Sequence, residues 1–288
     1  MGQGQTGGAI GVSIQMNGLK SINIELTSRC NKGDGTPGSG CFMCGRRKME
    51  ITHPELCDWG DIEYSTLEKI HPQIPKGVFI QWHWNGDPLL YGRLEDVFRL
   101  FSGHYMGLDT NGKLLMERRS ALKLLSSVTI SIIPDDPEGN EQLKIAERFI
   151  QEENRPSVMF RLLGEIDATR QYLIRMWSEK YDKVNYCKRI LHKPQGSFGY
   201  EKPVTKPEHG ICEEMLHKLA IDRYSNVNPC VRFDPEKKNI LGNLNESSLE
   251  SIWSSDKRKE WIKHHINFER HKVPLCGECD FYGCATSQ

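Results

Sequence analysis

The chain has 288 residues, 38% of them hydrophobic and 26% charged, and 38 basic residues balance 38 acidic ones. This neutral balance gives no electrostatic reason to expect broad nucleic-acid binding or binding to anionic membranes. The mean hydropathy of −0.55 and the absence of a long apolar run exclude a membrane-spanning helix. No basic segment followed by an apolar one opens the chain, so we expect no secretory signal and a cytoplasmic protein.

Residues 1–20 are polar and rich in glycine, and we expect them to form a flexible segment. The opening MGQGQT matches a pattern for N-myristoylation, but no basic cluster follows to provide a second membrane anchor. We therefore favour a flexible tail or a cloning remnant.

Short apolar segments then alternate with amphipathic ones. The expected strands are Ser21–Leu26, Gly77–Trp82, Tyr105–Asp109, Val128–Ile132, Ser157–Leu163 and Lys183–Leu191. The expected helices are Tyr64–His71, Leu94–Phe101, Leu114–Leu125, Glu138–Glu153 and Ala168–Tyr181. Such alternation predicts an α/β fold with a parallel sheet and with the chemistry at the C-terminal ends of the strands. Because a closed barrel needs about eight strands, we predict an open, partial (β/α)6 TIM-like barrel over residues 21–192.

A change in composition marks the end of this barrel. Residues 193–209 contain several prolines and glycines and are predicted to be a linker. Residues 210–288 contain one clear helix, Ser247–His264, and too little apolar material for a core of their own. We expect a metal ion or a cluster to hold this small C-terminal domain together.

The ten cysteines support that expectation. Most fall into two groups, Cys30, Cys41 and Cys44 near the N-terminus and Cys212, Cys230, Cys276, Cys279 and Cys284 near the C-terminus. Without an export signal, metal or cluster ligation explains them better than disulfides. A structural zinc site is normally closed by four protein ligands, so the three N-terminal thiolates indicate a metal centre with one open position. The isolated Cys57 and Cys187 are interpreted as buried thiols.

Several motifs together resemble the radical S-adenosylmethionine (SAM) enzymes with a C-terminal twitch domain, the short form of SPASM. IELTSRCN at 24–31 resembles the first strand running into the first cluster cysteine, followed by NGDP at 85–88 and LDTNG at 108–112. The C-terminal pattern consists of Cys212, Pro229–Cys230, LGN at 241–243, SLESIW at 248–253 and CGECDFYG at 276–283. The resemblance covers nearly the whole chain.

The first cysteine motif departs from the usual family pattern of Cys-x3-Cys-x2-Cys. Residues 31–40, all loop-forming, separate Cys30 from Cys41. An insertion in a loop costs little entropy and can leave the three thiolates converging on one cluster. The aromatic residue usual before the third cysteine is replaced by Met43, with Phe42 one position earlier.

The resemblance implies two 4Fe-4S clusters. Cys30, Cys41 and Cys44 hold the first, whose open iron binds SAM, and Cys212, Cys230, Cys276 and Cys279 hold the auxiliary one, with Cys284 as a substitute ligand. The implied SAM contacts are Asn85, Gly86, Asp87 and Pro88 for the methionyl amine, Ser131 and Arg161 for the carboxylate, Thr110 and Asn111 for the ribose, and Met43 for the adenine. A structural zinc is the alternative at the second site.

The same resemblance implies a radical enzyme of the oxidoreductase type. It would cleave SAM reductively to a 5′-deoxyadenosyl radical and abstract hydrogen from a small alcohol, sugar or nucleotide, in a dehydrogenation. It also implies an external electron donor such as flavodoxin or ferredoxin. Because only a short segment precedes the first strand, a small substrate is favoured over a peptide or protein. The second alternative is a non-catalytic, zinc-stabilised binding module. For His83, beside NGDP, core packing is favoured.

Overall fold

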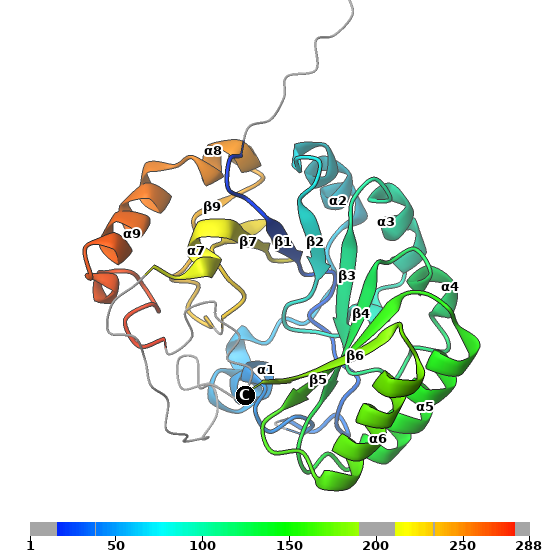
Figure 1. Ribbon diagram of the computed structural model, residues 1–288. Coiled ribbons are helices and arrows are strands. Elements are labelled where there is room, and N and C mark those ends of the chain that lie inside the picture. The colour runs from blue at the N-terminus through cyan, green and yellow to red at the C-terminus, as the bar shows by residue number, and fades with distance from the viewer. Residues whose placement is uncertain (1–15, 38, 190–210, 233, 280–288) are drawn as a thin grey trace, which may run out of the picture.

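A computed structural model describes residues 16–37, 39–189, 211–232 and 234–279 (Figure 1). The whole predicted linker (193–209), residues 1–15 of the N-terminal segment and Cys284 lie outside these residues. Within the described part of the chain, no helix is both long and apolar enough to cross a bilayer.

Six parallel strands lie side by side in chain order. They are β1 (Ser21–Ile24), β2 (Phe79–Trp82), β3 (Met106–Thr110), β4 (Ser127–Ile132), β5 (Ser157–Leu163) and β6 (Val184–Arg189). The main connecting helices are α2 (Tyr64–Ile70), α3 (Leu94–Leu100), α4 (Arg119–Leu122), α5 (Gly139–Glu152) and α6 (Ala168–Lys180), and they cover one face of the sheet (Figure 1). The predicted open, partial barrel is confirmed. The helix expected over Leu114–Leu125 is wrong in extent, because only Arg119–Leu122 is helical.

Alternation along the strands separates the core from the opposite face. Ile22, Ile24, Ile80 and Trp82 are fully buried, whereas the residues between them are partly accessible. Trp82 packs edge-on against Phe101 from the end of α3, with ring centroids 5.1 Å apart. The apolar side chains therefore point towards the helices, and the second face of the sheet is left for polar side chains.

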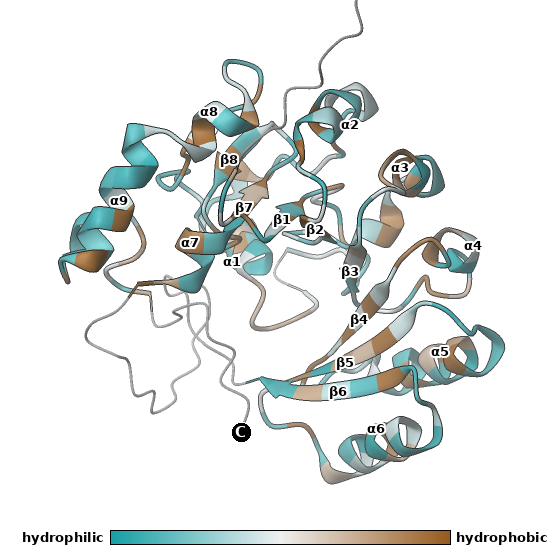
Figure 2. Cartoon of the chain, turned by 45° about the horizontal axis from the view of Figure 1, so that its top comes forward, coloured by the Kyte–Doolittle hydropathy of each residue, from teal (hydrophilic) through white to brown (hydrophobic). Residues whose placement is uncertain are grey.

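The C-terminal region continues the same sheet. β7 (Lys218–Ile221) pairs in parallel with all of β1, and β8 (Asn226–Asn228) and β9 (Gly242–Asn243) follow antiparallel. Its helices are α7 (Glu213–His217), α8 (Leu249–Trp253) and α9 (Asp256–Ile266), and their apolar side chains join one core with those of the barrel. Hydrophobic segments run along β4 and β5, whereas α9 is mostly hydrophilic (Figure 2).

The single helix expected over Ser247–His264 is two helices. The Ser255 side chain accepts a hydrogen bond from the amide of Arg258 and starts α9 directly after α8 has ended. Serine favours this capping role, which interrupts a helix that apolar periodicity alone predicts as continuous.

Candidate functional site: a polar barrel cavity beside two cysteine sets

The partly accessible face of the strands lines a cavity of about 400 Å³ inside the partial barrel. Its wall includes Asn23 on β1, Gln81 on β2, Asp109 on β3 and Arg161 on β5. These positions follow from the two-residue period of each strand, which directs alternate side chains to the face away from the helices. The cavity is therefore lined by hydrogen-bonding and charged groups.

Asp109 is the centre of the polar network in this cavity. Its carboxylate forms an ion pair with Arg161 and accepts a hydrogen bond of 2.6 Å from the Gln81 amide. The Nδ1 atom of His83 lies 3.6 Å from the same carboxylate. Burial alone would raise the pKa of Asp109, but His83 and Arg161 hold it below its ordinary value. The carboxylate is therefore ionised at neutral pH.

The C-terminal region completes the wall of this cavity. Glu214 and Lys218 form an ion pair of 2.6 Å there, and Arg232 follows Cys230 by two residues. Arg189, at the end of β6, lies on the same wall. The cavity is consequently shared between the barrel strands and the region that contains the second cysteine set.

The first cysteine set lies in the loop between β1 and α1 (Gly45–Thr52). Burial is the main reason why the pKa of the Cys41 thiol is raised to about 12, and the Cys44 and Cys30 thiols add to this rise. Cys44 and Cys30 therefore lie near enough to Cys41 to act on it electrostatically across the ten-residue spacing. Neutral thiols are stabilised by burial when no metal is present, and a cationic cluster would favour the thiolate form.

The NGDP turn packs directly against the backbone that leads to Cys30. A Cβ atom on Gly86 would lie 2.3 Å from the carbonyl oxygen of Thr27 and 2.4 Å from that of Arg29. Only glycine permits this approach, because a side chain would displace one of the two backbones. Gly86 thus sets the distance between the β2 turn and the first cysteine.

Asp87 uses its carboxylate within the protein. It accepts hydrogen bonds from the amides of Leu89 and Asn111, and from the Thr110 hydroxyl at 2.8 Å. Burial raises its pKa, and these donors oppose that rise. Asp87 therefore positions the end of β3 relative to the NGDP turn, and the contact predicted between this turn and the methionyl amine of SAM stays a prediction.

The partners of Asp87 reach the cysteine loop. The Asn111 side-chain amide lies 2.8 Å from the Asn31 side-chain oxygen and 3.9 Å from the Cys30 sulfur. Asn85 instead donates to Glu25 at 2.9 Å. Thr110 and Asn111 were predicted near the ribose, and the structure brings both to the same end of the sheet as Cys30.

Phe42, which precedes the predicted adenine contact Met43, borders a separate cavity. Phe42 is 53% exposed and lines a cavity of about 320 Å³ with Ile133, Pro134 and Pro137. Met43 does not line this cavity. The aromatic ring is thus present, one position earlier than the family pattern suggests.

Ser131 and Arg161 are direct neighbours in the register of β4 and β5. The backbone oxygen of Ser131 accepts a hydrogen bond from Gln142, and the Arg161 guanidinium uses two of its nitrogens on Asp109. The two residues lie together, as required for a shared ligand, and Arg161 is already paired inside the cavity.

The thiols of the second cysteine set also act on one another electrostatically. Burial raises the pKa of Cys276, and the thiols of Cys230, Cys212 and Cys279 raise it further. Asn239 donates to the Cys230 sulfur at 3.7 Å, and the Cys212 amide donates to His265 at 3.4 Å. Such contacts orient the ligands of iron–sulfur clusters.

In the described ranges, no three Cys, His, Asp or Glu side chains are close enough together to hold a single metal ion. Cys57 and Cys187 belong to neither set and are only half-buried, so the prediction that they are buried thiols is wrong.

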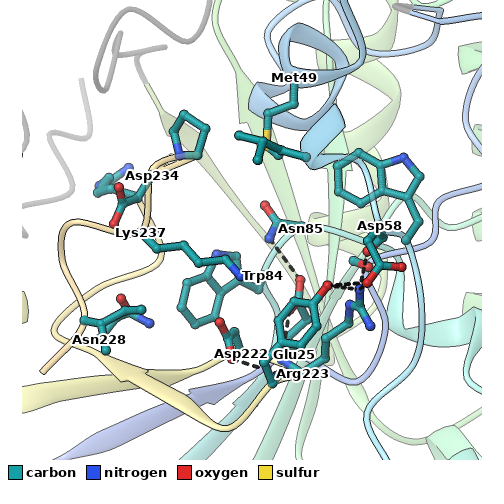
Figure 3. A pocket seen from close by; sticks show the side chains of 17 residues that line it. Glu25, Met49, Asp58, Trp84, Asn85, Asp222, Arg223, Asn228, Asp234 and Lys237 are labelled. Carbon is teal, nitrogen blue, oxygen red and sulfur yellow. Dashed lines mark hydrogen bonds and ion pairs between the residues drawn. The ribbon is translucent and has the colours of Figure 1, made fainter. Parts of the chain in front are cut away.

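A second pocket lies where the ends of β1, β2 and β7 meet (Figure 3). Glu25 accepts a hydrogen bond of 3.1 Å from the Arg223 amide, and the Tyr224 hydroxyl lies 2.6 Å from Asp58. Trp84 and Lys237 also line it. The sequence analysis missed this pocket; the available signal was Glu25, an acidic residue inside an otherwise apolar strand end.

Comparisons with known proteins show what the chain as a whole resembles. A family model described as SPASM, an iron–sulfur cluster-binding domain, matches residues 212–280. The S-adenosyl-L-methionine-dependent 2-deoxy-scyllo-inosamine dehydrogenase of Niallia circulans is 22% identical over 272 residues, which is 93% of this chain and 95% of that protein. The structure of BtrN in complex with AdoMet and 2-DOIA covers 94% of this chain at a TM-score of 0.61 and 18% identity, and the chain covers 96% of it. The resemblance to radical SAM proteins with a SPASM-type domain is confirmed.

Two further comparisons involve proteins whose names indicate other substrates. The Pyrococcus furiosus tungsten-containing aldehyde ferredoxin oxidoreductase cofactor-modifying protein is 27% identical over 235 residues, 77% of this chain and 55% of that protein. Streptococcus suis SuiB bound to precursor peptide SuiA has a TM-score of 0.61 at 12% identity, with 85% of this chain and 67% of that chain covered. The fold is therefore compatible with more than one substrate class.

Proposed function

We propose that this chain is a radical SAM dehydrogenase that oxidises an alcohol carbon of a small polar molecule, such as a sugar or a nucleotide. The polar barrel cavity carries the proposal. Its volume of about 400 Å³ lies within the usual range for small-molecule sites, and its wall offers donors and acceptors suited to hydroxyl groups. Niallia dehydrogenase, similar along nearly its full length, supports this class of reaction.

The cavity also has a suitable place relative to the cysteines. Asp109 is two residues before Asn111, whose amide approaches Cys30, and Arg232 is two residues after Cys230. A substrate bound between these residues lies close to both proposed cluster sites. A dehydrogenation would draw on both, because one hydrogen atom and then one electron leave the substrate.

We assign the first 4Fe-4S cluster to Cys30, Cys41 and Cys44 and the auxiliary one to Cys212, Cys230, Cys276 and Cys279. When bound, the first cluster and SAM supply the 5′-deoxyadenosyl radical that removes hydrogen from the substrate. The residues of the chain orient the reactants and exclude water.

The proposed SAM contacts rest on where the predicted residues lie in the structure. The NGDP turn, held by Gly86 and Asp87, offers backbone groups to the methionyl amine. Ser131 and Arg161 are adjacent for the carboxylate, and the guanidinium keeps further N–H donors beyond those used on Asp109. Phe42 offers a ring on which adenine can stack.

The test is anaerobic purification followed by iron and sulfide analysis and by a turnover assay. Two 4Fe-4S clusters give about eight irons per chain. The protein is then incubated with SAM, dithionite and 2-deoxy-scyllo-inosamine deuterated at its carbinol carbons, together with a panel of deuterated sugars and nucleosides. We expect deuterium in 5′-deoxyadenosine and a ketone detectable by mass spectrometry.

Three results would contradict this proposal in different ways. Zinc without iron would indicate the binding module. SAM cleavage without deuterium transfer from any small molecule would leave the peptide alternative. Deuterium transfer without a ketone would indicate a radical reaction other than dehydrogenation.

A further inference from the structure

His83 has a position that core packing does not explain. It follows Phe79 and Gln81 at two-residue intervals along β2, so its side chain points into the barrel cavity. Its amide continues the sheet by donating to the carbonyl oxygen of Ile24 at 3.2 Å. The imidazole is 33% exposed, which leaves it accessible from the cavity although the strand beneath it is buried.

Resting on the proposed function, we infer that His83 is the residue that accepts the hydroxyl proton of the substrate during dehydrogenation, oriented by Asp109. Nδ1 of the imidazole faces the Asp109 carboxylate, 3.6 Å from its nearer oxygen. Among the described residues, no hydrogen-bond partner occupies Nε2. The second ring nitrogen is therefore the one available to a bound hydroxyl group.

The proposed step balances as follows. With SAM and the clusters bound, hydrogen abstraction at the carbinol carbon would leave a carbon-centred radical that still bears its O–H group. His83 would take the hydroxyl proton, and one electron would pass to an iron–sulfur acceptor held by the cysteines, so that the C=O double bond forms. The imidazolium returns its proton to water after the product has left.

The other titratable groups that line this cavity are poor proton acceptors. Arg161, Arg189, Arg232 and Lys218 are cations. Glu214 is ion-paired with Lys218 at 2.6 Å. Asp109 is ionised and engaged by Arg161, and its lowered pKa makes its carboxylate a weak base. Within the described part of the cavity wall, His83 is the residue suited to this role.

The charges around His83 favour its neutral form. Burial lowers its pKa below the ordinary value of 6.5, Asp109 opposes that change, and the arginines at 161, 189 and 232 reinforce it. A lowered pKa means that the imidazole is unprotonated at pH 7 and ready to accept a proton. Asp109 stabilises the imidazolium that forms, and the nearby arginines favour its return to the neutral state.

The experiment compares wild type, His83→Gln and His83→Ala in the holoenzyme, with the compound that the wild type oxidises in the assay above. We expect 5′-deoxyadenosine formation to persist, because SAM cleavage precedes proton loss. Ketone formation should fall by about 100-fold or more, which is the usual contribution of a positioned general base. His53→Gln is the matched control, since His53 is exposed and lies outside this cavity, and its ketone yield should equal that of the wild type.

Two readouts separate proton transfer from a structural role. In the wild type, ketone formation should rise with pH through a pKa below 6.5 and stay flat above it, because only neutral imidazole accepts a proton. In His83→Ala, added imidazole should restore ketone formation, and more basic methylimidazoles should restore it further. If His83 were only structural, ketone formation would not rise with pH in this way, and rescue would not depend on the base strength of the added imidazole.

The possible failures are distinguishable. Full ketone formation by His83→Gln, or an unrescued His83→Ala whose cluster content and circular dichroism match the wild type, overturns the role of His83 and leaves the dehydrogenase standing. Absence of ketone from every compound with the wild type overturns the dehydrogenase proposal and this inference together.

Discussion

Cys30, Cys41 and Cys44 come from one loop, whereas Cys212, Cys230, Cys276 and Cys279 come from separate segments of the C-terminal region. The loop cysteines are positioned by neighbours from other strands, through Gly86 and through Asn111 with its partner Asp87. The C-terminal cysteines lie in a region that is attached to the barrel by β7 and by a shared core. Three protein ligands would leave one iron of a cluster open to a reactant. Four protein ligands would saturate a cluster, which could then stabilise the fold or transfer an electron.

The largest effect should come from removing the loop ligands. Replacing Cys30, Cys41 and Cys44 together with alanine should abolish 5′-deoxyadenosine formation, because no protein ligands remain for the cluster that binds SAM. About half of the iron should stay bound in the C-terminal region. Anaerobic iron analysis and chromatography of 5′-deoxyadenosine measure both, and continued SAM cleavage by this variant would refute the assignment.

Removing the C-terminal ligands should separate the two steps of the reaction. A Cys276→Ala, Cys279→Ala variant should still form 5′-deoxyadenosine but lose the ketone, because the substrate radical has no electron acceptor. Since β7 pairs along the whole of β1, we expect circular dichroism to show a folded protein.

The control is Cys57→Ala, which removes a half-buried thiol outside both sets and should leave both products unchanged. Undiminished ketone from a folded double variant without the second cluster would eliminate electron transfer. Loss of the fold in that variant would indicate that the cluster mainly stabilises the C-terminal region.

A smaller effect is expected from crowding the turn behind Cys30. Gly86→Ala would place a methyl group against the Thr27 and Arg29 carbonyls, and such overpacking costs about 1–3 kcal/mol. We expect a lower melting temperature and less iron in the first cluster. Gly92→Ala is the matched control, because nothing lies within 4 Å of its Cβ position. Equal melting temperatures for the two variants would refute the positioning role of Gly86.

The smallest effect should follow from shortening the cysteine loop. The loop is anchored at its start, where Lys32 forms a buried ion pair of 2.5 Å with Asp136 and Lys113 donates to the Asn31 carbonyl at 2.9 Å. Deleting residues 34–37 spares both contacts, so we expect iron content to be unchanged. Iron loss from the first cluster would show instead that the middle of the loop sets ligand geometry.

Much of this architecture could be predicted locally. The strand Ser157–Leu163 was predicted with its observed bounds, because its short apolar segment is bounded by Pro156 and Gly164. Predicted helix boundaries were wrong where a capping residue starts a new helix, as at Ser255. They were also wrong where part of the segment forms turns, as before α4. The likeness to radical SAM proteins was readable because cysteine spacing and the order of the motifs are properties of the chain.

The roles of individual site residues could be predicted less well from the sequence. Asp87 matches an acidic position of the family motif, yet its three hydrogen-bond partners come from the turn after β2 and from the end of β3. His83 and Asp109 are 26 positions apart and were not linked by any sequence pattern. The domain boundaries and the assignment of individual SAM contacts remain predictions.

The sequence by itself determined the strand and helix periods, the two cysteine sets and the order of the motifs, because these depend on neighbouring residues and on ligand chemistry. Only the tertiary structure decided that β7 joins β1 and that His83, Asp109 and Arg161 share one cavity. The physical reason is that parallel strand pairing brings together side chains that are distant along the chain. Burial and ion pairing then set the charge states that they have there.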